Sequence, residues 1–292
     1  MIFAVSQEIV IRSNANPILW DFLNPLSLLR NLYLHKNLIW QFSKRETESR
    51  YRGSYLGIVW SFLTPFFMLL VFTFVFGIVF KARWGDPNIK SQSLAEFALI
   101  MFSGQIAFQL FSEPVSRAST LIVSVPNFVK KIVFPIQILP VVIANATVFQ
   151  AAVSCCVLCV LSLFIKGSLP WTIVLIPVAL IPMLLMGVGV SWFVSALGVY
   201  VRDINFVVNV CLQLLYYSCP IFYSIHSVPI KYQAFIANNP LTPGIELIRS
   251  CLVLGIVPPI HTWVFGMGIG IVVAIAGYAW FMMTKRGFAD VL

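Results

Sequence analysis

The chain has 292 residues, of which 60% are hydrophobic and 10% are charged, and its formal net charge at pH 7 is +9. A soluble globule of this length needs far more polar side chains to cover its surface, so the composition excludes a soluble protein. The apolar surface must meet lipid, which indicates an integral membrane protein.

Residues 1–25 are expected to form an N-terminal extension. Their short apolar stretch has no basic region before it and no small-residue cleavage site, so we do not expect a cleaved signal peptide. Residues 26–52 are expected to form a cytoplasmic amphipathic helix at the membrane interface, followed by a basic linker. Together these two segments would precede the membrane domain.

The amphipathic pattern covers residues 26–44 as one helix. Apolar side chains share one broad face, while Arg30, Asn37, Gln41 and Lys44 share the opposite face. Such a helix is typical of the headgroup layer of a bilayer. The alternative is a helix buried against a cytosolic partner protein, and the two interpretations are compatible.

Six long runs without Lys, Arg, Asp or Glu follow, and a spanning helix needs about 20 apolar residues. The runs are 53–80, 97–112, 132–165, 167–201, 204–225 and 250–284. The second run is short, so its helix is expected to extend into the flanking residues. The fold class is therefore an all-α integral membrane protein with a six-span transmembrane domain over residues 53–284.

The distribution of basic residues sets the expected orientation. With both termini in the cytoplasm, thirteen of the nineteen Lys and Arg residues fall on the cytoplasmic side. Residues 285–292 would then be a cytoplasmic tail. Because the net charge reflects membrane topology, we do not expect nucleic-acid binding.

Neither a catalytic constellation nor an ATP-binding motif is visible. The three histidines are dispersed and lack the spacing of a metal site. The sequence has no G-x-x-x-x-G-K-[ST] phosphate loop and almost no ionisable group deep in a span. We therefore expect a chain that is not an enzyme and holds no metal or cofactor, and whose energy for work against a gradient comes from a partner.

Two segments between spans are candidates for contacts. Residues 113–131 are expected to be a cytosolic segment where a partner contacts the chain, the alternative being an ordinary polar loop. The contact residues would be Arg117, Pro126, Asn127, Lys130 and Lys131.

On the outer side, short helices over about 229–254 are expected to dip into the outer leaflet and gate the mouth, unless they are simple loop packing. The outer gate residues would be Tyr232, Pro240, Pro243, Glu246 and Arg249.

The stretches RETESRYRGSYLGIVWSFLTPF, SVPNFVKKIVFP and NNPLTPGIELIRSCLVLG resemble the permease subunit of bacterial ABC-2 type polysaccharide exporters, which carry O-antigen, capsule or teichoic acid. The resemblance runs from about residue 27 to the C-terminus. It implies a multi-pass homodimer in the inner membrane, paired with two ATP-binding cassette subunits. These subunits would bind ATP and Mg, and the coupling segment 113–131 would contact them. Such an assembly moves a lipid-linked polysaccharide to the outer side. The alternatives are an ABC-2 permease for a drug or small lipid, and a membrane enzyme or scaffold of glycan assembly.

Two sets of residues are candidates for substrate contact. Arg45, Arg50 and Arg52 would lie at headgroup depth and recruit a lipid pyrophosphate, the alternative being a positive-inside topology signal only. Aromatic side chains can stack on sugar rings, although in a span they also serve as packing or as an interfacial belt. The channel-lining candidates are Trp60, Phe66, Tyr216, Tyr217 and Tyr223.

Overall fold

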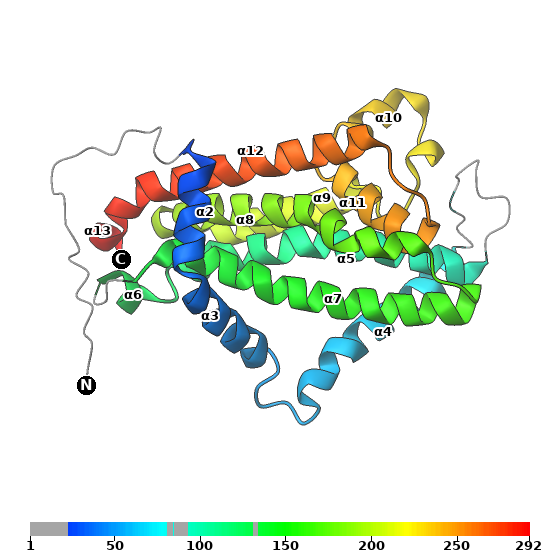
Figure 1. Ribbon diagram of the computed structural model, residues 1–292, viewed down its shortest axis with the longest axis horizontal. Helices are drawn as coiled ribbons and strands as arrows, with labels where there is room; N and C mark the ends of the chain where they lie inside the picture. The colour runs from blue at the N-terminus through cyan, green and yellow to red at the C-terminus, as the bar shows by residue number, and fades with distance from the viewer. Residues whose placement is uncertain (1–22, 81–83, 85–92, 131–133) are drawn as a thin grey trace.

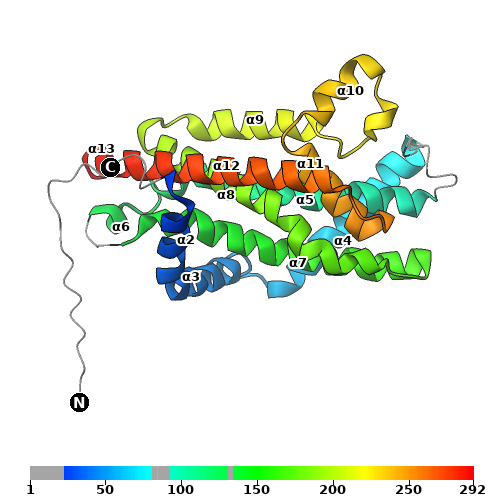
Figure 2. The same ribbon diagram turned by 45° about the horizontal axis from the view of Figure 1, so that its top comes forward.

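The computed structural model describes residues 23–80, 84, 93–130 and 134–292, and the described residues form helices and loops without a strand. The extension predicted over 1–25 therefore lies almost entirely outside the described residues. Figures 1 and 2 show the long helices side by side along the longest axis, with short helices at both ends. This arrangement confirms the predicted all-α class.

Within the described residues, five helical stretches are long and apolar enough to cross a membrane. A sixth apolar helix, α9, is shorter, because Pro220 follows closely on its last residue, Ser218. The main helices of the spans, in chain order, are α4 (Trp60–Phe72), α5 (Leu94–Leu121), α7 (Leu139–Lys166), α8 (Ile176–Tyr200), α9 (Ile204–Ser218) and α12 (Ile260–Thr284). They correspond to the six predicted runs.

Short turns extend several of these helices. The first span begins with η1 (Gly57–Val59) and ends with η2 (Thr73–Val79), while η3 (Ile136–Ile138) precedes α7 and η4 (Trp171–Leu175) precedes α8. The last span begins at Ile260, ten residues after the start of the apolar run, because Pro258 and Pro259 end the preceding segment. The C-terminal tail is η7 (Lys285–Gly287) and α13 (Phe288–Val291).

Helix α5 is much longer than its uncharged run. It begins with a capping box, in which Ser93 and Glu96 satisfy each other's backbone N–H groups. It ends at Leu121, so the first nine residues of segment 113–131 continue a membrane helix. Only α6 (Pro126–Lys130) is a separate short helix in that segment.

Helix α8 packs between α5 and α12. At the crossing of α8 and α12, a Cβ on Gly277 would lie 1.9 Å from the carbonyl oxygen of Gly189. Small residues permit such close backbone approach, which drives helix association in lipid. The contacts of α8 with α12 and with α5 hold α5 in position, and α5 is the helix on which the candidate site is built.

The interfacial segment is two helices, α2 (Pro25–Leu34) and α3 (Lys36–Ser49), with a break at His35. The single helix that was predicted is interrupted at His35, whose backbone leaves the helical conformation (φ −100°, ψ 12°). Ile39 of α3 is buried against α7, whereas Tyr33 and Trp40 remain exposed. The segment is thus anchored to its own chain and still offers aromatic side chains to a bilayer.

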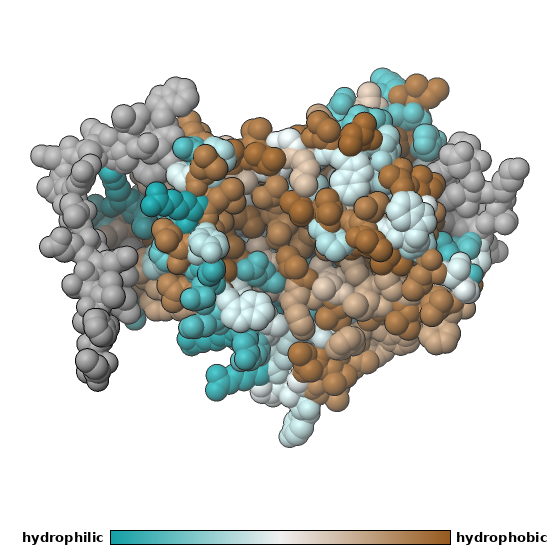
Figure 3. Space-filling view, in the orientation of Figure 1, coloured by the Kyte–Doolittle hydropathy of each residue, from teal (hydrophilic) through white to brown (hydrophobic). Residues whose placement is uncertain are grey.

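The surface pattern agrees with a membrane-spanning body. Figure 3 shows hydrophobic residues over the long helices and hydrophilic residues gathered over α3 and near α10. The outer segment contains η5 (Ile225–Ser227), α10 (Ile230–Ala237), α11 (Thr242–Arg249) and η6 (Ser250–Leu254). Helices α10 and α11 lie at the end of the molecule opposite α2, α3 and the C-terminus (Figure 1). The body therefore has two distinct polar ends.

Candidate functional site

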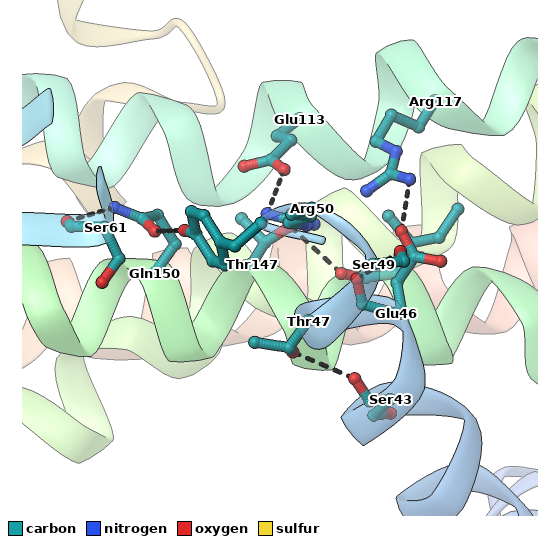
Figure 4. Close-up of polar contacts among 12 residues, drawn as sticks. Ser43, Glu46, Thr47, Ser49, Arg50, Ser61, Glu113, Arg117, Thr147 and Gln150 are labelled. Atoms are coloured by element: carbon teal, nitrogen blue, oxygen red, sulfur yellow. Dashed lines mark hydrogen bonds and ion pairs between the residues drawn. The ribbon is translucent and has the colours of Figure 1, made fainter. Parts of the chain in front are cut away.

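Two ion pairs join α3 to α5. Arg50, which caps the end of α3, donates from Nη1 to Oε1 of Glu113 over 2.5 Å. Arg117 of α5 donates to Oε1 of Glu46 of α3. On each helix the two charges are four residues apart and opposite in sign, so each helix contributes one cation and one anion to the two pairs. Figure 4 shows both arginines pointing at their partners. We call these four residues the clasp.

The Arg50–Glu113 pair is the more buried half of the clasp. The two side chains are 16% and 21% exposed. Among the described residues, Nε and Nη2 of Arg50 and Oε2 of Glu113 have no further hydrogen-bond partner. Each charge therefore depends on the other for compensation, and removing one would leave the other desolvated and unpaired.

The linker after α3 is tied to α7 by a second set of contacts. The Tyr51 hydroxyl donates to Oε1 of Gln150 over 2.6 Å, and Nε2 of Gln150 donates to the Ser61 carbonyl over 3.0 Å (Figure 4). Burial raises the pKa of Tyr51 above its ordinary value, in keeping with a neutral hydroxyl that donates here. The chain turns between these anchors at Gly53 and Gly57, whose φ angles are +86° and +48°.

The predicted recruitment arginines do not form one cluster. Arg45 and Arg52 line a cavity of about 520 Å³ together with Tyr51 and Gly57. Arg45 also lines a second cavity of about 450 Å³ between α3, α5 and α7. Arg50 is held by Glu113 instead. Recruitment of a headgroup stays a prediction, and the cavity with Arg45 and Arg52 is where it would occur.

One face of α5 is polar over most of the span. Every residue from Phe97 to Thr120 that is not buried inside the chain is polar, and the intervals of three and four residues place them on one side of the helix. We call this the polar face. Its residues are Gln105, Gln109, Ser112, Glu113, Ser116, Arg117 and Thr120.

Helix α9 presents matching polar residues to α5. The Ser119 hydroxyl donates to Oδ1 of Asn205 over 2.8 Å, and the Ser116 hydroxyl donates to Oδ1 of Asn209 over 2.7 Å. Nearer the other end of α9, the Tyr216 hydroxyl donates to Gln105. Between these hydrogen-bonded pairs lies a shallow cavity of about 390 Å³.

The candidate aromatic residues fall into two places. Tyr216 and Tyr217 lie near the end of α9, and Tyr223 donates from its hydroxyl to the Ser218 carbonyl over 3.2 Å. Tyr217 is exposed, whereas Tyr216 packs on Phe108. The other two candidates belong to the first span: Trp60 and Phe66 are partly exposed on α4. Their role as channel lining stays a prediction.

The predicted ATPase contacts are separated by the structure. Arg117 belongs to the clasp, while Pro126 and Asn127 are exposed at the start of α6. The side chain of Lys130 and all of Lys131 lie outside the described residues. The exposed start of α6 is therefore the described part of this candidate surface.

The predicted outer gate combines an exposed helix with a buried one. Tyr232 of α10 is exposed, and so is Pro240 in the following turn, but α11 with Pro243 is packed inside the body. Helix α11 is thus held by packing within the chain, whereas a helix that dips into the outer leaflet would contact lipid. Gating stays a prediction.

The buried end of α11 carries a fully buried cation. Arg249 donates from Nη1 to Oε1 of Glu246 over 2.5 Å and from Nη2 to the Pro220 carbonyl over 2.6 Å. Its guanidinium lies 4.3 Å from the centre of the Trp84 ring. The residue therefore joins α11 to the loop that follows α9.

Replacing Arg249 by Ala should destabilise the protein measurably. The change removes the partner of Glu246 and leaves the Pro220 carbonyl without its donor, a loss of about 3 kcal/mol. In a chain of this size that lowers the melting temperature by roughly 5–10 °C. The measurement is thermal unfolding of the purified protein in detergent. Lys231→Ala in exposed α10 is the control, and equal melting temperatures for both variants would contradict the role of Arg249.

The sequence analysis assigned no role to Glu46 or Glu113, and it did not recognise the polar face. Glu46 and Arg50 have opposite charges at a spacing of four, as do Glu113 and Arg117, and this pattern was a usable signal. The spacing of polar residues between Gln105 and Thr120 was a second one.

Comparison with known proteins agrees with this architecture. Residues 37–253 match the family described as ABC-2 type transporter. The chain is 27% identical over 218 residues to the O-antigen export system permease protein RfbA of Myxococcus xanthus, covering 74% of this chain and 80% of that protein. It is 25% identical over 271 residues to a protein of the same name from Klebsiella pneumoniae, covering 91% and 99%. It is 24% identical over 223 residues to the polysialic acid transport protein KpsM of Escherichia coli, covering 72% and 79%.

The family match covers well over half of the chain, and the similar proteins are permease components of bacterial exporters. The six apolar helices and the polar face within them are features of such a component. The chain belongs to the ABC-2 type transporter family, as a membrane-spanning permease subunit.

Proposed function

We propose that two copies of this chain form a path through the bacterial inner membrane for a lipid-linked polysaccharide of the O-antigen type, driven by two ATP-binding cassette subunits. The names of the similar proteins support the polysaccharide as cargo. The chain itself has no phosphate loop, so ATP hydrolysis belongs to the partner.

The polar face of α5 is the observation that carries this proposal. Ionisable and strongly polar side chains are costly against lipid, so they face a water-filled path or another protein in a span. Helix α9 covers only part of the polar face: Thr120 is exposed and Gln109 is half-buried. A second copy of the chain would enclose the rest and complete a path.

The two ends of the molecule fit entry and exit. The cavity with Arg45 and Arg52 offers cationic donors beside the interfacial helices, where a pyrophosphate headgroup would arrive. The start of α6 would contact the ATP-binding subunit, with Lys130 and Lys131 as predicted contacts. Helices α10 and α11 would close the outer mouth.

Water access along the polar face tests the proposal. In a variant without the six native cysteines, Ser112→Cys should react with a membrane-impermeant thiol reagent in the assembled exporter. Val160→Cys, on an exposed apolar surface of α7, is the matched control. We expect Ser112→Cys to react at least about tenfold faster, because a thiolate forms only where water reaches it.

The same samples report on function. Reaction at position 112 should block delivery of the surface polysaccharide in cells, since the label would fill the path. Equal reaction rates at the two positions would place the polar face away from water. Labelling at position 112 that leaves export unchanged would contradict a path along α5.

A further inference from the structure

The cavity between α5 and α9 lies between two sets of hydrogen-bonded residues. On one side Ser116 bonds to Asn209, and on the other Tyr216 bonds to Gln105. At the cavity itself this pairing is interrupted. Its wall contains Ser112 and Gln213, which both line the same space of about 390 Å³. The side chains of these two residues make no hydrogen bond with another described residue.

An aromatic surface completes the wall. The rings of Phe108 and Tyr216 also line this cavity, and their centres are 5.1 Å apart. A sugar ring has hydroxyl groups at its edge and C–H groups on its faces. An amide and a hydroxyl beside an aromatic ring therefore match both parts of a sugar unit.

The charges near this cavity are already compensated. Glu113 and Arg117 line it too, and they pair with Arg50 and Glu46 in the clasp. Helix α9 contributes amides and hydroxyls from Ile204 to Ser218, and its sequence has no charged residue. Apart from these two paired charges, the lining presents neutral hydrogen-bonding groups, so a carboxylate or phosphate finds no unpaired cation there.

We propose that the cavity lined by Ser112, Gln213 and Tyr216 is a binding subsite for uncharged sugar units, so that the exporter selects a polymer whose repeat carries no carboxylate or phosphate. This inference rests on the proposed function and adds the substrate class to it. The amide of Gln213 both donates and accepts, so it can exchange hydrogen bonds with successive hydroxyls as a chain passes.

Export of two defined polymers tests the inference. The chain and its ATP-binding partner are expressed in two strains that lack their own exporter and use the same lipid pyrophosphate carrier. One strain makes a polymer of unsubstituted hexoses, and the other makes a polymer with a uronic acid in each repeat. We expect roughly tenfold more of the hexose polymer at the cell surface, because the cavity wall gives a carboxylate no unpaired cation to bind.

Variants at Gln213 relate that selectivity to the cavity. Gln213→Leu should lower export of the hexose polymer roughly tenfold at an equal protein level, because it removes the hydrogen-bonding groups. Gln213→Lys should raise export of the uronic acid polymer and lower that of the hexose polymer. Gln213→Asn, which keeps the amide, is the control.

The outcomes separate this inference from the proposed function. Equal export of both polymers would overturn the neutral-sugar subsite and leave polysaccharide export standing. Unchanged selectivity in Gln213→Lys would also overturn it. If neither polymer reached the surface although the complex assembled, the proposed function would fail, and the subsite would fail with it.

Discussion

Arg50→Glu should abolish export, and adding Glu113→Arg should restore it. The single change places two carboxylates at the buried half of the clasp, where loss of one partner of an ion pair costs about 3–5 kcal/mol. Because these side chains keep some exposure to solvent, we expect the lower end of that range. It is enough to detach α3 from α5. The measurements are surface polysaccharide in cells and the melting temperature of the purified chain.

The exchanged pair distinguishes two roles of Arg50. Arg50→Glu with Glu113→Arg rebuilds the ion pair with its charges reversed but removes the cation from the linker. Recovery of export would show that the clasp is what matters. If the double variant melts normally and still does not export, Arg50 is needed for the headgroup, as the sequence-based prediction states.

Lys44→Glu is the matched control on the same helix. Lys44 lies 4.0 Å from Glu48, and both side chains are more than 65% exposed. Solvent screens such a pair, which contributes only about 0–1 kcal/mol. The change is expected to leave both export and melting temperature near their original values. A loss as large as that of Arg50→Glu would mean that overall charge on α3, rather than the clasp, controls activity.

Gly277→Leu should prevent the membrane domain from folding. A Cβ at this position would lie 1.9 Å from the Gly189 carbonyl oxygen, and this oxygen belongs to the backbone of α8 and cannot turn aside. The helices would have to separate along their contact, which loses packing over the whole crossing. We expect little or no monodisperse protein by size-exclusion chromatography in detergent.

Gly268→Leu is the control within α12, because a Cβ at Gly268 has no neighbour within 4 Å. The two variants have the same helix propensity change and nearly the same hydropathy change. A normal yield for Gly268→Leu with a lost yield for Gly277→Leu would locate the effect at the crossing. Normal yields for both would contradict the close packing of α8 and α12.

The uncharged runs located the membrane helices, but prolines inside two of the runs moved the helix ends. Pro220 ends α9, and the Pro258–Pro259 pair delays the last span until Ile260. The predicted span was shorter than α5, because the charged residues Glu113 and Arg117 end the uncharged run. A helix can continue past charged residues when partners elsewhere in the fold compensate those charges. Here the partners of Glu113 and Arg117 are more than sixty residues away in the sequence.

The interfacial segment shows the same limit. The periodicity of residues 26–44 identified an amphipathic helix, but no local pattern distinguishes an apolar residue that meets lipid from one that meets protein. Ile39 packs against α7, while Trp40 is exposed. Only the docked position of α3 reveals this division.

By itself, the sequence determined the membrane class, the six spans, the absence of a phosphate loop and the position of the basic linker, because hydropathy and motif spacing are local properties. Tertiary structure alone decided which side of each span is covered. It joined Glu46 to Arg117 and Arg50 to Glu113, covered only part of the polar face of α5 with α9, and buried Arg249. These features depend on contacts between distant segments, and the packing of helices, rather than the pattern within any one of them, creates such contacts.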